Sequence, residues 1–269
     1  MPKRNLIFDI GVNEGEDSSF YLEKGFTVVG VEANPVLADR LRQTFRDQIT
    51  RGQYSLVASG IWSEARSLPF YINLDNDHWS SFDKAYGARD GSKYREHNVE
   101  CVTISSLLGK YGVPYYMKID VEGADKRILR DLRRERDLPE FISVEEYGVQ
   151  AIDDLRALGY SGFKIVPQRD KRSVKPPAPA LEGRYVDRDF SGRDSGLFGR
   201  ELPGQWISYE SIRKDFTTVI RKEDSIYIGP PDEWHDIHAS LEPQRGVLSG
   251  LRRAYTSWTQ RVREAVTQP

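Results

Sequence analysis

The stretch LIFDIGVNEGED, residues 6–17, decides the fold predicted for this chain. It opens with apolar residues typical of a strand buried on both faces, and continues into a turn that carries Gly11 and Gly15. Glycine has no side chain to clash and tolerates unusual backbone angles, so the backbone of such a turn can approach a ligand closely. We therefore expect this turn to form one edge of a binding site.

The rest of the first 166 residues continues this pattern, because short apolar runs alternate with charged amphipathic stretches. The alternation predicts an α/β fold, a Rossmann-like sheet with helices on both faces. The predicted strands are Asn5–Asp9, Thr27–Glu32, Tyr54–Ala58, Leu68–Ile72, Tyr115–Ile119, Phe141–Glu145 and Gly162–Val166. The predicted helices are Ser18–Lys24, Pro35–Arg51, Ile104–Tyr111, Gly123–Arg136 and Val149–Leu158.

The composition changes at residues 168–194, where prolines and charged residues interrupt any periodicity. We expect a mobile loop there, and divide the chain into a domain of residues 1–167 and an α-rich, loop-containing extension of residues 168–269. The extension would cover the substrate or join two subunits of a homodimer. Its predicted elements are a helix at Ser208–Arg221, a short strand at Ser225–Ile228 and a terminal helix at Gly246–Thr267.

The overall charge excludes some classes of partner. The 269 residues include 39 Lys and Arg against 41 Asp and Glu, so no net field attracts a polyanion such as nucleic acid. The single cysteine, Cys101, cannot form an internal disulfide, and no apolar stretch reaches the roughly 20 residues that span a bilayer. We expect a cytoplasmic protein with a small-molecule partner.

The residues around the glycine turn indicate what kind of molecule binds there. Their spacing differs from the Gly-x-Gly-x-x-Gly fingerprint of dinucleotide binding, and a crowd of acids would repel a pyrophosphate. Glu32 ends the next apolar run, where a carboxylate accepts hydrogen bonds from both ribose hydroxyls. A cationic nucleoside such as S-adenosylmethionine fits all of these features, whereas NAD fits only the glycines and Glu32. The crowding acids are Asp9, Glu14, Glu16 and Asp17.

A simpler alternative is that Gly11 and Gly15 only shape a turn and that Glu32 caps a strand.

A second constellation lies in the stretch YYMKIDVEGAD, residues 115–125, where Asp120 and Glu122 follow a predicted strand and precede a helix. The carboxyl ends of parallel strands meet at one edge, so these acids should face the same crevice as Glu32.

Several roles are open to this pair of acids. They can orient a methyl acceptor, hold a Mg²⁺ ion or act as a base, and Glu145 at the end of the following strand can join them. The alternative for Glu122 is a cap on the helix N-terminus. We do not predict a metal site, because the four histidines show no ligand spacing typical of zinc.

Three pieces of the sequence, in this order, resemble the FkbM family of S-adenosylmethionine-dependent methyltransferases. They are DIGVNEG at 9–15, EANP at 32–35 and KIDVEGA at 118–124. The resemblance implies a class I methyltransferase sheet with residues 1–167 as the cofactor-binding domain, and O-methylation of a sugar, glycoconjugate or secondary metabolite. Ala33 stands where the family usually has proline, and Asp125 where it usually has a second glutamate.

The resemblance also implies roles for single residues. The methionine part of the cofactor would be held by Asp9, Gly11, Asn13 and Gly15. The ribose and adenine would contact Glu32, Ala33, Ser59 and Gly60, and Asp120 would lie beside the cofactor. Asp120 and Glu122 would form the reaction side. For the acceptor, the resemblance suggests the paired Ser80 and Ser81. The residues themselves add other acceptor-binding candidates: His78 in the same loop, Glu145 at its strand end, and Trp206 and Trp234, whose rings can stack on a polyol or simply pack the extension onto the sheet.

His238 is an alternative base to Asp120. Two other functions stay open at this point. One is a non-catalytic nucleotide-binding or scaffold protein that keeps a methyltransferase fold, and the other is an NAD-dependent dehydrogenase.

Overall fold

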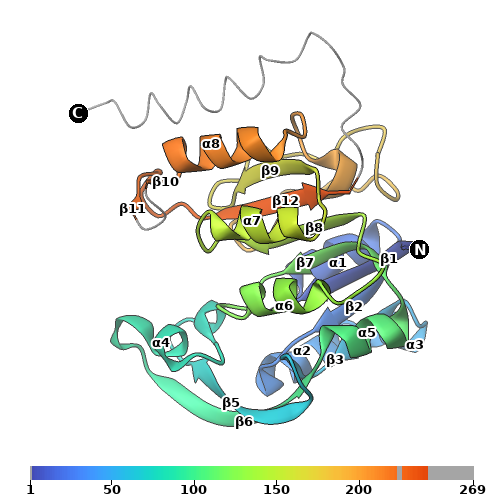
Figure 1. Ribbon diagram of the computed structural model, residues 1–269. Coiled ribbons are helices and arrows are strands. Elements are labelled where there is room, and N and C mark those ends of the chain that lie inside the picture. Colours follow the sequence, from blue (N-terminus) through green and yellow to red (C-terminus); the bar gives the residue numbers. More distant parts are fainter. Residues whose placement is uncertain (1, 223–225, 242–269) are drawn as a thin grey trace.

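The computed structural model describes residues 2–222 and 226–241, and a seven-stranded sheet lies at the centre of this part of the chain (Figure 1). The strand order is β3-β2-β1-β7-β8-β12-β9. Neighbouring strands are parallel except at β12, which is antiparallel to β8 and β9. The strands are β1 (Lys3–Ile10), β2 (Thr27–Val31), β3 (Tyr54–Val57), β7 (Pro114–Ile119), β8 (Phe141–Glu145), β9 (Gly162–Pro167) and β12 (His235–Ser240).

Helices cover both faces of this sheet. Successive side chains of a strand point to opposite faces, so Phe8 packs under one group of helices and Ile7 under the other. The first group lies side by side in Figure 1 and comprises α5 (Ile104–Tyr111), α6 (Asp125–Leu132), α7 (Gln150–Ala157) and α8 (Tyr209–Val219). The opposite face is covered by α1 (Glu16–Glu23) and α2 (Pro35–Thr44). This is the Rossmann-like α/β fold predicted from the sequence.

One predicted helix, Pro35–Arg51, is two helices in the structure. The chain leaves helical geometry at Phe45 (φ −101°, ψ 22°) between α2 and α3 (Arg46–Thr50). Phe45 is buried, and its ring lies 4.6 Å from the ring of Tyr54 on β3. Burial of this ring against the sheet therefore accompanies the break.

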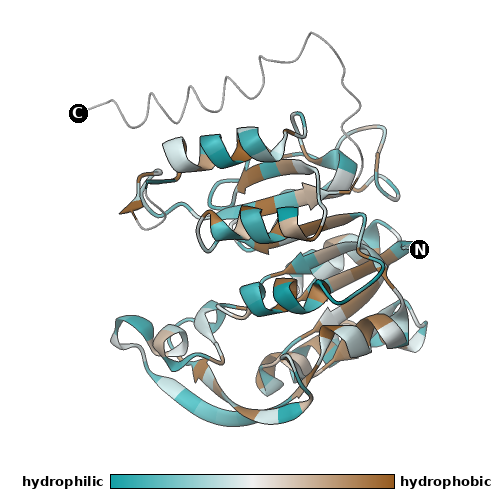
Figure 2. Cartoon of the chain, viewed as in Figure 1, coloured by the Kyte–Doolittle hydropathy of each residue, from teal (hydrophilic) through white to brown (hydrophobic). Residues whose placement is uncertain are grey.

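The predicted strand Leu68–Ile72 is present, but it belongs to a second sheet and not to the central one. This sheet has the order β4-β6-β5, and its long hairpin forms an arm beside the central sheet (Figure 1). The arm is largely hydrophilic (Figure 2), because only one side of the hairpin packs against the body. Its elements are β4 (Gly60–Ile61), β5 (Arg66–Asn73), η1 (Asp77–Trp79), α4 (Lys84–Gly87), η2 (Arg89–Gly91) and β6 (Tyr94–Val102).

The segment after residue 167 is not a separate helical lobe, in contrast to the prediction. Its strand β12 lies inside the central sheet, between β8 and β9. The stretch expected to be a mobile loop packs against α1, with Phe190 4% exposed and its ring 5.1 Å from that of Phe20. The remaining described elements after residue 167, besides α8 and β12, are η3 (Gly199–Glu201), β10 (Arg221–Lys222) and β11 (Ile226–Tyr227).

Two more predicted elements of the extension concern its last part. The strand predicted at Ser225–Ile228 corresponds to β11, which pairs with β10 in a short antiparallel hairpin. The predicted helix Gly246–Thr267 lies outside the described residues.

Candidate functional site

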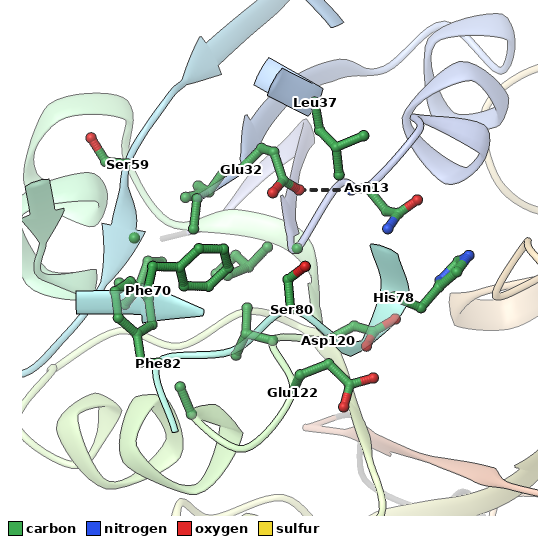
Figure 3. Close-up of a pocket in the computed structure, with 18 of the residues that line it drawn as sticks. Asn13, Glu32, Leu37, Ser59, Phe70, His78, Ser80, Phe82, Asp120 and Glu122 are labelled. Atoms are coloured by element: carbon green, nitrogen blue, oxygen red, sulfur yellow. Dashed lines mark hydrogen bonds between the residues drawn. The ribbon is translucent and has the colours of Figure 1, made fainter. Parts of the chain in front are cut away.

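A pocket lies at the carboxyl ends of β1, β2 and β7 (Figure 3). The chain runs from β1 outward through β2 and β3, then returns to β7 on the other side of β1. Ligands of open α/β sheets bind at such a reversal of strand order. The pocket holds about 680 Å³ of empty space, part of it open to solvent.

The glycine turn after β1 is shaped by a contact with the protein itself. Gly11 has a φ of +89°, and a Cβ atom at this position would lie 1.7 Å from the carbonyl oxygen of Asp120. Gly15 has no space for a side chain either, because a Cβ atom would lie 2.8 Å from the ring of Phe45. Gly11 thus allows the ends of β1 and β7 to meet, and of the two glycines only Gly11 lines the pocket.

Glu32 is a wall of the pocket at the end of β2. Its carboxylate accepts hydrogen bonds from the backbone N–H groups of Asn13 (2.9 Å) and Asn34 (2.7 Å). Figure 3 shows the first of these bonds, with the carboxylate facing the pocket. Glu32 is 7% exposed, and burial raises its pKa to about 7 in spite of the two N–H donors. The carboxylate therefore has amide partners, and its remaining lone pairs are available to a ligand.

The pocket has an apolar end and a polar end (Figure 3). The rings of Phe70 and Phe82, both from the arm, lie on the same side of the pocket as Ser59. A Cβ atom at Gly60 would lie 2.2 Å from the ring of Phe82, so a glycine at this position leaves space for that ring. The polar end contains Asn13, His78, Asp120 and Glu122.

Asp120 reaches the pocket from the end of β7. Its side chain is 43% exposed, and its Oδ2 lies 3.2 Å from the Nζ of the buried Lys118. The same Nζ lies 3.1 Å from Asp17 and 3.8 Å from Asp9. Burial lowers the pKa of Lys118, but the carboxylates around it outweigh this effect and hold the pKa well above its usual value. Lys118 is therefore charged and ties β1, β7 and α1 together.

Glu122 is held by the tip of the arm. The guanidinium of Arg89 donates a hydrogen bond to Glu122 Oε2 (2.8 Å), and Ser81 Oγ donates to the carbonyl of Glu122 (2.6 Å). Arg89 also lies over the rings of Trp79 and Tyr86, at 4.7 and 5.8 Å. Burial and the charge of Asp120 raise the pKa of Glu122 to about 7, although Arg89 opposes this effect.

No side chain caps the N-terminus of α6, whose N-cap residue is Ala124, and Asp125 instead holds the turn that precedes the helix. The backbone N–H groups of Val121 and Gly123 donate to the carboxylate of Asp125 (3.3 and 3.1 Å). Glu122 itself has φ of +46° and lines the pocket. The capping alternative considered for Glu122 is therefore wrong.

Some predicted ligand-binding residues lie beneath the pocket wall. Asp9 is fully buried, accepts a hydrogen bond from Ser18 Oγ (2.6 Å) and is absent from the pocket lining. Ser81 is likewise buried and acts through its bond to Glu122. The lining does include many of the predicted residues, namely Gly11, Asn13, Glu32, Ala33, Ser59, Gly60, His78, Ser80, Asp120 and Glu122.

Two other predicted residues are far from the pocket opening. His238 is 1% exposed in the middle of β12, where its ring is stacked on Tyr116 and burial lowers its pKa to about 3. Such an imidazole has no access to a substrate, so the structure does not support His238 as a base. Trp206 packs 5.6 Å from the ring of Phe141, which begins β8 at the opposite edge of the sheet. Neither residue is brought to the site.

Glu145 and Trp234 lie at the carboxyl edge of the sheet but outside the pocket lining. Sequence reasoning missed Phe70, Phe82 and Arg89, because their strands and turns belong to the arm and reach the pocket only through its packing. The position of Asp236 beside Glu145 was not predicted, because the mixed polar sequence of β12 does not show the apolar run of a buried strand.

The described residues include no group of three or more His, Cys, Asp or Glu side chains placed to bind a metal ion. Glu122, considered as a Mg²⁺ ligand, is paired with Arg89. In the same part of the chain, no helix has both the length and the apolar character needed to cross a bilayer.

The comparisons with known proteins agree with this architecture. The model of the methyltransferase FkbM domain matches residues 9–164. This match and the Rossmann-like sheet identify a domain of the S-adenosylmethionine-dependent methyltransferase class. Because the match covers more than half of the chain, the protein belongs to the FkbM methyltransferase family.

Solved structures give more distant similarities. A methyltransferase FkbM from Methylobacillus flagellatus KT is 14% identical with a TM-score of 0.41, over 61% of this chain and 40% of its own. The present chain therefore matches less than half of that protein. A precorrin-6y C5,15-methyltransferase from Geobacter metallireducens GS-15 is 11% identical with a TM-score of 0.37, over 90% and 82% of the two chains. No curated protein matches the sequence.

Proposed function

We propose that this chain is an O-methyltransferase that uses S-adenosylmethionine to methylate a hydroxyl of a sugar, glycoconjugate or secondary metabolite. The observation that carries the proposal is the composition of the pocket wall. It contains Glu32 at one end and Asp120 at the other, and none of its lining residues is Lys or Arg. A cationic nucleoside suits this wall, whereas the pyrophosphate of NAD would meet its carboxylates with no positive side chain among the lining residues to offset them.

The residues present fit the parts of S-adenosylmethionine one by one. Glu32 offers a buried carboxylate to the two ribose hydroxyls. Phe70 and Phe82 provide an apolar surface for the adenine, next to Ser59. Asn13 and Asp120 then face the methionine part at the polar end.

S-adenosylmethionine supplies a methyl group on a positively charged sulfur. In the proposed transfer an acceptor oxygen forms a bond to this carbon, the carbon–sulfur bond breaks, and its electron pair stays on the sulfur. The acceptor hydroxyl gives its proton to a carboxylate, and Asp120 is our first candidate because it is the exposed member of the Lys118 cluster. Alignment of the reacting atoms can contribute roughly 7 to 11 kcal/mol, and a base about a hundred- to ten-thousand-fold in rate.

Calorimetric titration with S-adenosylmethionine, S-adenosylhomocysteine and NAD in parallel tests the proposal. We expect saturable binding of the first two and none of NAD. Binding of NAD alone would favour a dehydrogenase, and binding of none would favour a scaffold protein.

The variant Asp120→Asn tests the assignment of the base. It should slow methyl transfer by about a hundredfold or more, and weaken the binding of S-adenosylhomocysteine far less than that. Asp47→Asn, at an exposed position of α3, is the matched control. Wild-type turnover of Asp120→Asn would remove this residue from the mechanism.

A further inference from the structure

Three carboxyl groups form a row across neighbouring strands at the carboxyl edge of the sheet. Asp236 of β12 pairs in register with Glu145 of β8. Ile119 of β7 pairs with Val144, so Asp120 follows beside Glu145. Neighbouring strands lie about 4.8 Å apart. The side chains of Ile119, Val144 and Ile237 pack in the core under α5–α8, so the carboxyl row is on the opposite face.

Two members of this row have no bonded partner within residues 2–222 and 226–241. Asp236 is 7% exposed, and its carboxyl group forms no hydrogen bond or ion pair with these residues. The carboxyl group of the partly buried Glu145 forms none with them either. The nearest lysines are already engaged, since Lys118 is shared by three other carboxylates and Lys171 donates to the carbonyl of Gln168 (2.7 Å). A nearly buried carboxyl without a partner is costly, and a ligand can supply the missing partner.

The electrostatics of the row agree with a missing cation. Burial, then the charge of Asp120, raises the pKa of Asp236 to about 7, while Lys171 and Lys118 oppose the rise and Asp17 adds to it. Burial, followed by Asp120 and other acids nearby, also raises the pKa of Glu145 well above its usual value. A cation placed between these two groups would restore their ordinary ionised state.

The position of the row separates it from the nucleoside. Along the sheet the order is Glu32 after β2, Gly11 after β1, Asp120 after β7, Glu145 at the end of β8 and Asp236 in β12. Glu145 and Asp236 therefore extend the edge beyond Asp120, on the side away from the proposed ribose ligand. An acceptor must approach Asp120 from this side if the proposed cofactor occupies the pocket.

We propose that Glu145 and Asp236 form an acceptor subsite that binds an ammonium group, so that the acceptor is a hydroxyl compound carrying an amine, such as an amino sugar. This inference rests on the proposed methyltransferase function. An ammonium group brings three hydrogen-bond donors and one positive charge, which suits two adjacent carboxylates. Trp234, 39% exposed and two residues before Asp236, offers an aromatic surface at the same edge.

The experiment compares a matched pair of probes on the full chain saturated with S-adenosylhomocysteine. Glucosamine carries the ammonium group, and N-acetylglucosamine has the same hydroxyls without the charge. We expect glucosamine to bind at least about tenfold more tightly, as followed by NMR titration. This preference should disappear in Glu145→Gln and in Asp236→Asn, and should persist in the surface control Glu64→Gln.

The outcomes separate the subsite from the proposed function. Equal or tighter binding of N-acetylglucosamine, or no binding of either sugar, would overturn the ammonium subsite. Weaker binding of S-adenosylhomocysteine in Asp236→Asn would also overturn it, because the row would then serve the nucleoside. Failure of the wild-type chain to bind S-adenosylhomocysteine would instead refute the function on which the subsite rests. Removal of one carboxyl relieves like-charge repulsion, so we expect both variants to fold.

Discussion

The substitution Glu32→Gln separates a ligand contact from a structural bond at the same residue. The two oxygens of the carboxylate each accept one backbone N–H, from Asn34 at 2.7 Å and from Asn13 at 2.9 Å. Glutamine has one acceptor oxygen, so one of these N–H groups would face an amide N–H₂ instead. The same change removes the negative charge offered to the ribose hydroxyls.

The expected magnitudes follow from these contacts. A buried donor that loses its acceptor costs about 1–3 kcal/mol, so the free energy of unfolding should fall by about that amount. A hydrogen bond to a charged group contributes about 1.5–3 kcal/mol, so S-adenosylmethionine should bind about 10- to 150-fold more weakly. With a pKa of about 7 for Glu32, the wild-type affinity should also rise about tenfold between pH 6 and pH 8, as the carboxylate ionises.

Calorimetry at both pH values and urea unfolding measure the two effects separately. Glu32→Gln should bind weakly and lose the part of the pH dependence that Glu32 causes, whereas the exposed control Glu64→Gln should behave as wild type. If Glu32→Gln loses stability but binds within twofold of wild type at both pH values, the residue only holds the turn. The ribose assignment would then be refuted.

Three further predictions concern the turn, the arm and β12. Gly11→Ala should lower the free energy of unfolding in urea by at least about 2 kcal/mol, because the new Cβ adds a collision with the backbone to the strain of a positive φ. The control Gly25→Ala, at φ +94° with nothing within 4 Å of the new Cβ, should show the strain alone. Arg89→Ala removes the cation beside Glu122 and should shift the acid limb of the pH–rate profile to higher pH, with partial rescue by Arg89→Lys. His238→Phe should keep methyl transfer. In wild type, burial lowers the pKa of His238 to about 3, so below pH 6.5 the unfolded chain binds a proton more readily than the folded one. The free energy of unfolding should therefore fall by up to about 5 kcal/mol as the pH decreases from 6.5 towards 3, and by less in the variant.

The central strands could be predicted because strands buried on both faces appear as apolar runs, and β1, β7 and β8 are of this kind. The strand β12 could not, because HDIHAS is mostly polar, lacks the apolar run of a buried strand, and pairs with strands about 70 to 100 residues earlier in the chain. The arm was misassigned for a related reason. Its strand β5 has the period of a strand, and only tertiary pairing with β6 decides which sheet it joins.

The site could be predicted where the backbone alone brings residues together. Gly11, Glu32 and Asp120 each follow a parallel strand, and such strand ends meet at one edge whatever the loops do. Phe82 lies at the same edge because the arm packs there, and Asp236 because it belongs to an antiparallel strand of the sheet. The local sequence pattern predicts neither position.

In the structure, the acids that crowd the glycine turn are not the carboxylates that a cationic ligand would meet. The acids around the glycine turn are paired within the protein: Asp17 with Lys118 at 3.1 Å, and Glu14 with Arg193 at 2.6 Å. They stabilise the packing of α1 and of the segment after residue 167, so they place no demand on a ligand. Within residues 2–222 and 226–241, no ion pair involves Glu32, Glu145 or Asp236, so these carboxylates are the ones open to a ligand. Because Lys118 is shared by α1, β1 and β7, the same cation that neutralises the turn also holds Asp120 where the ends of these strands face the pocket.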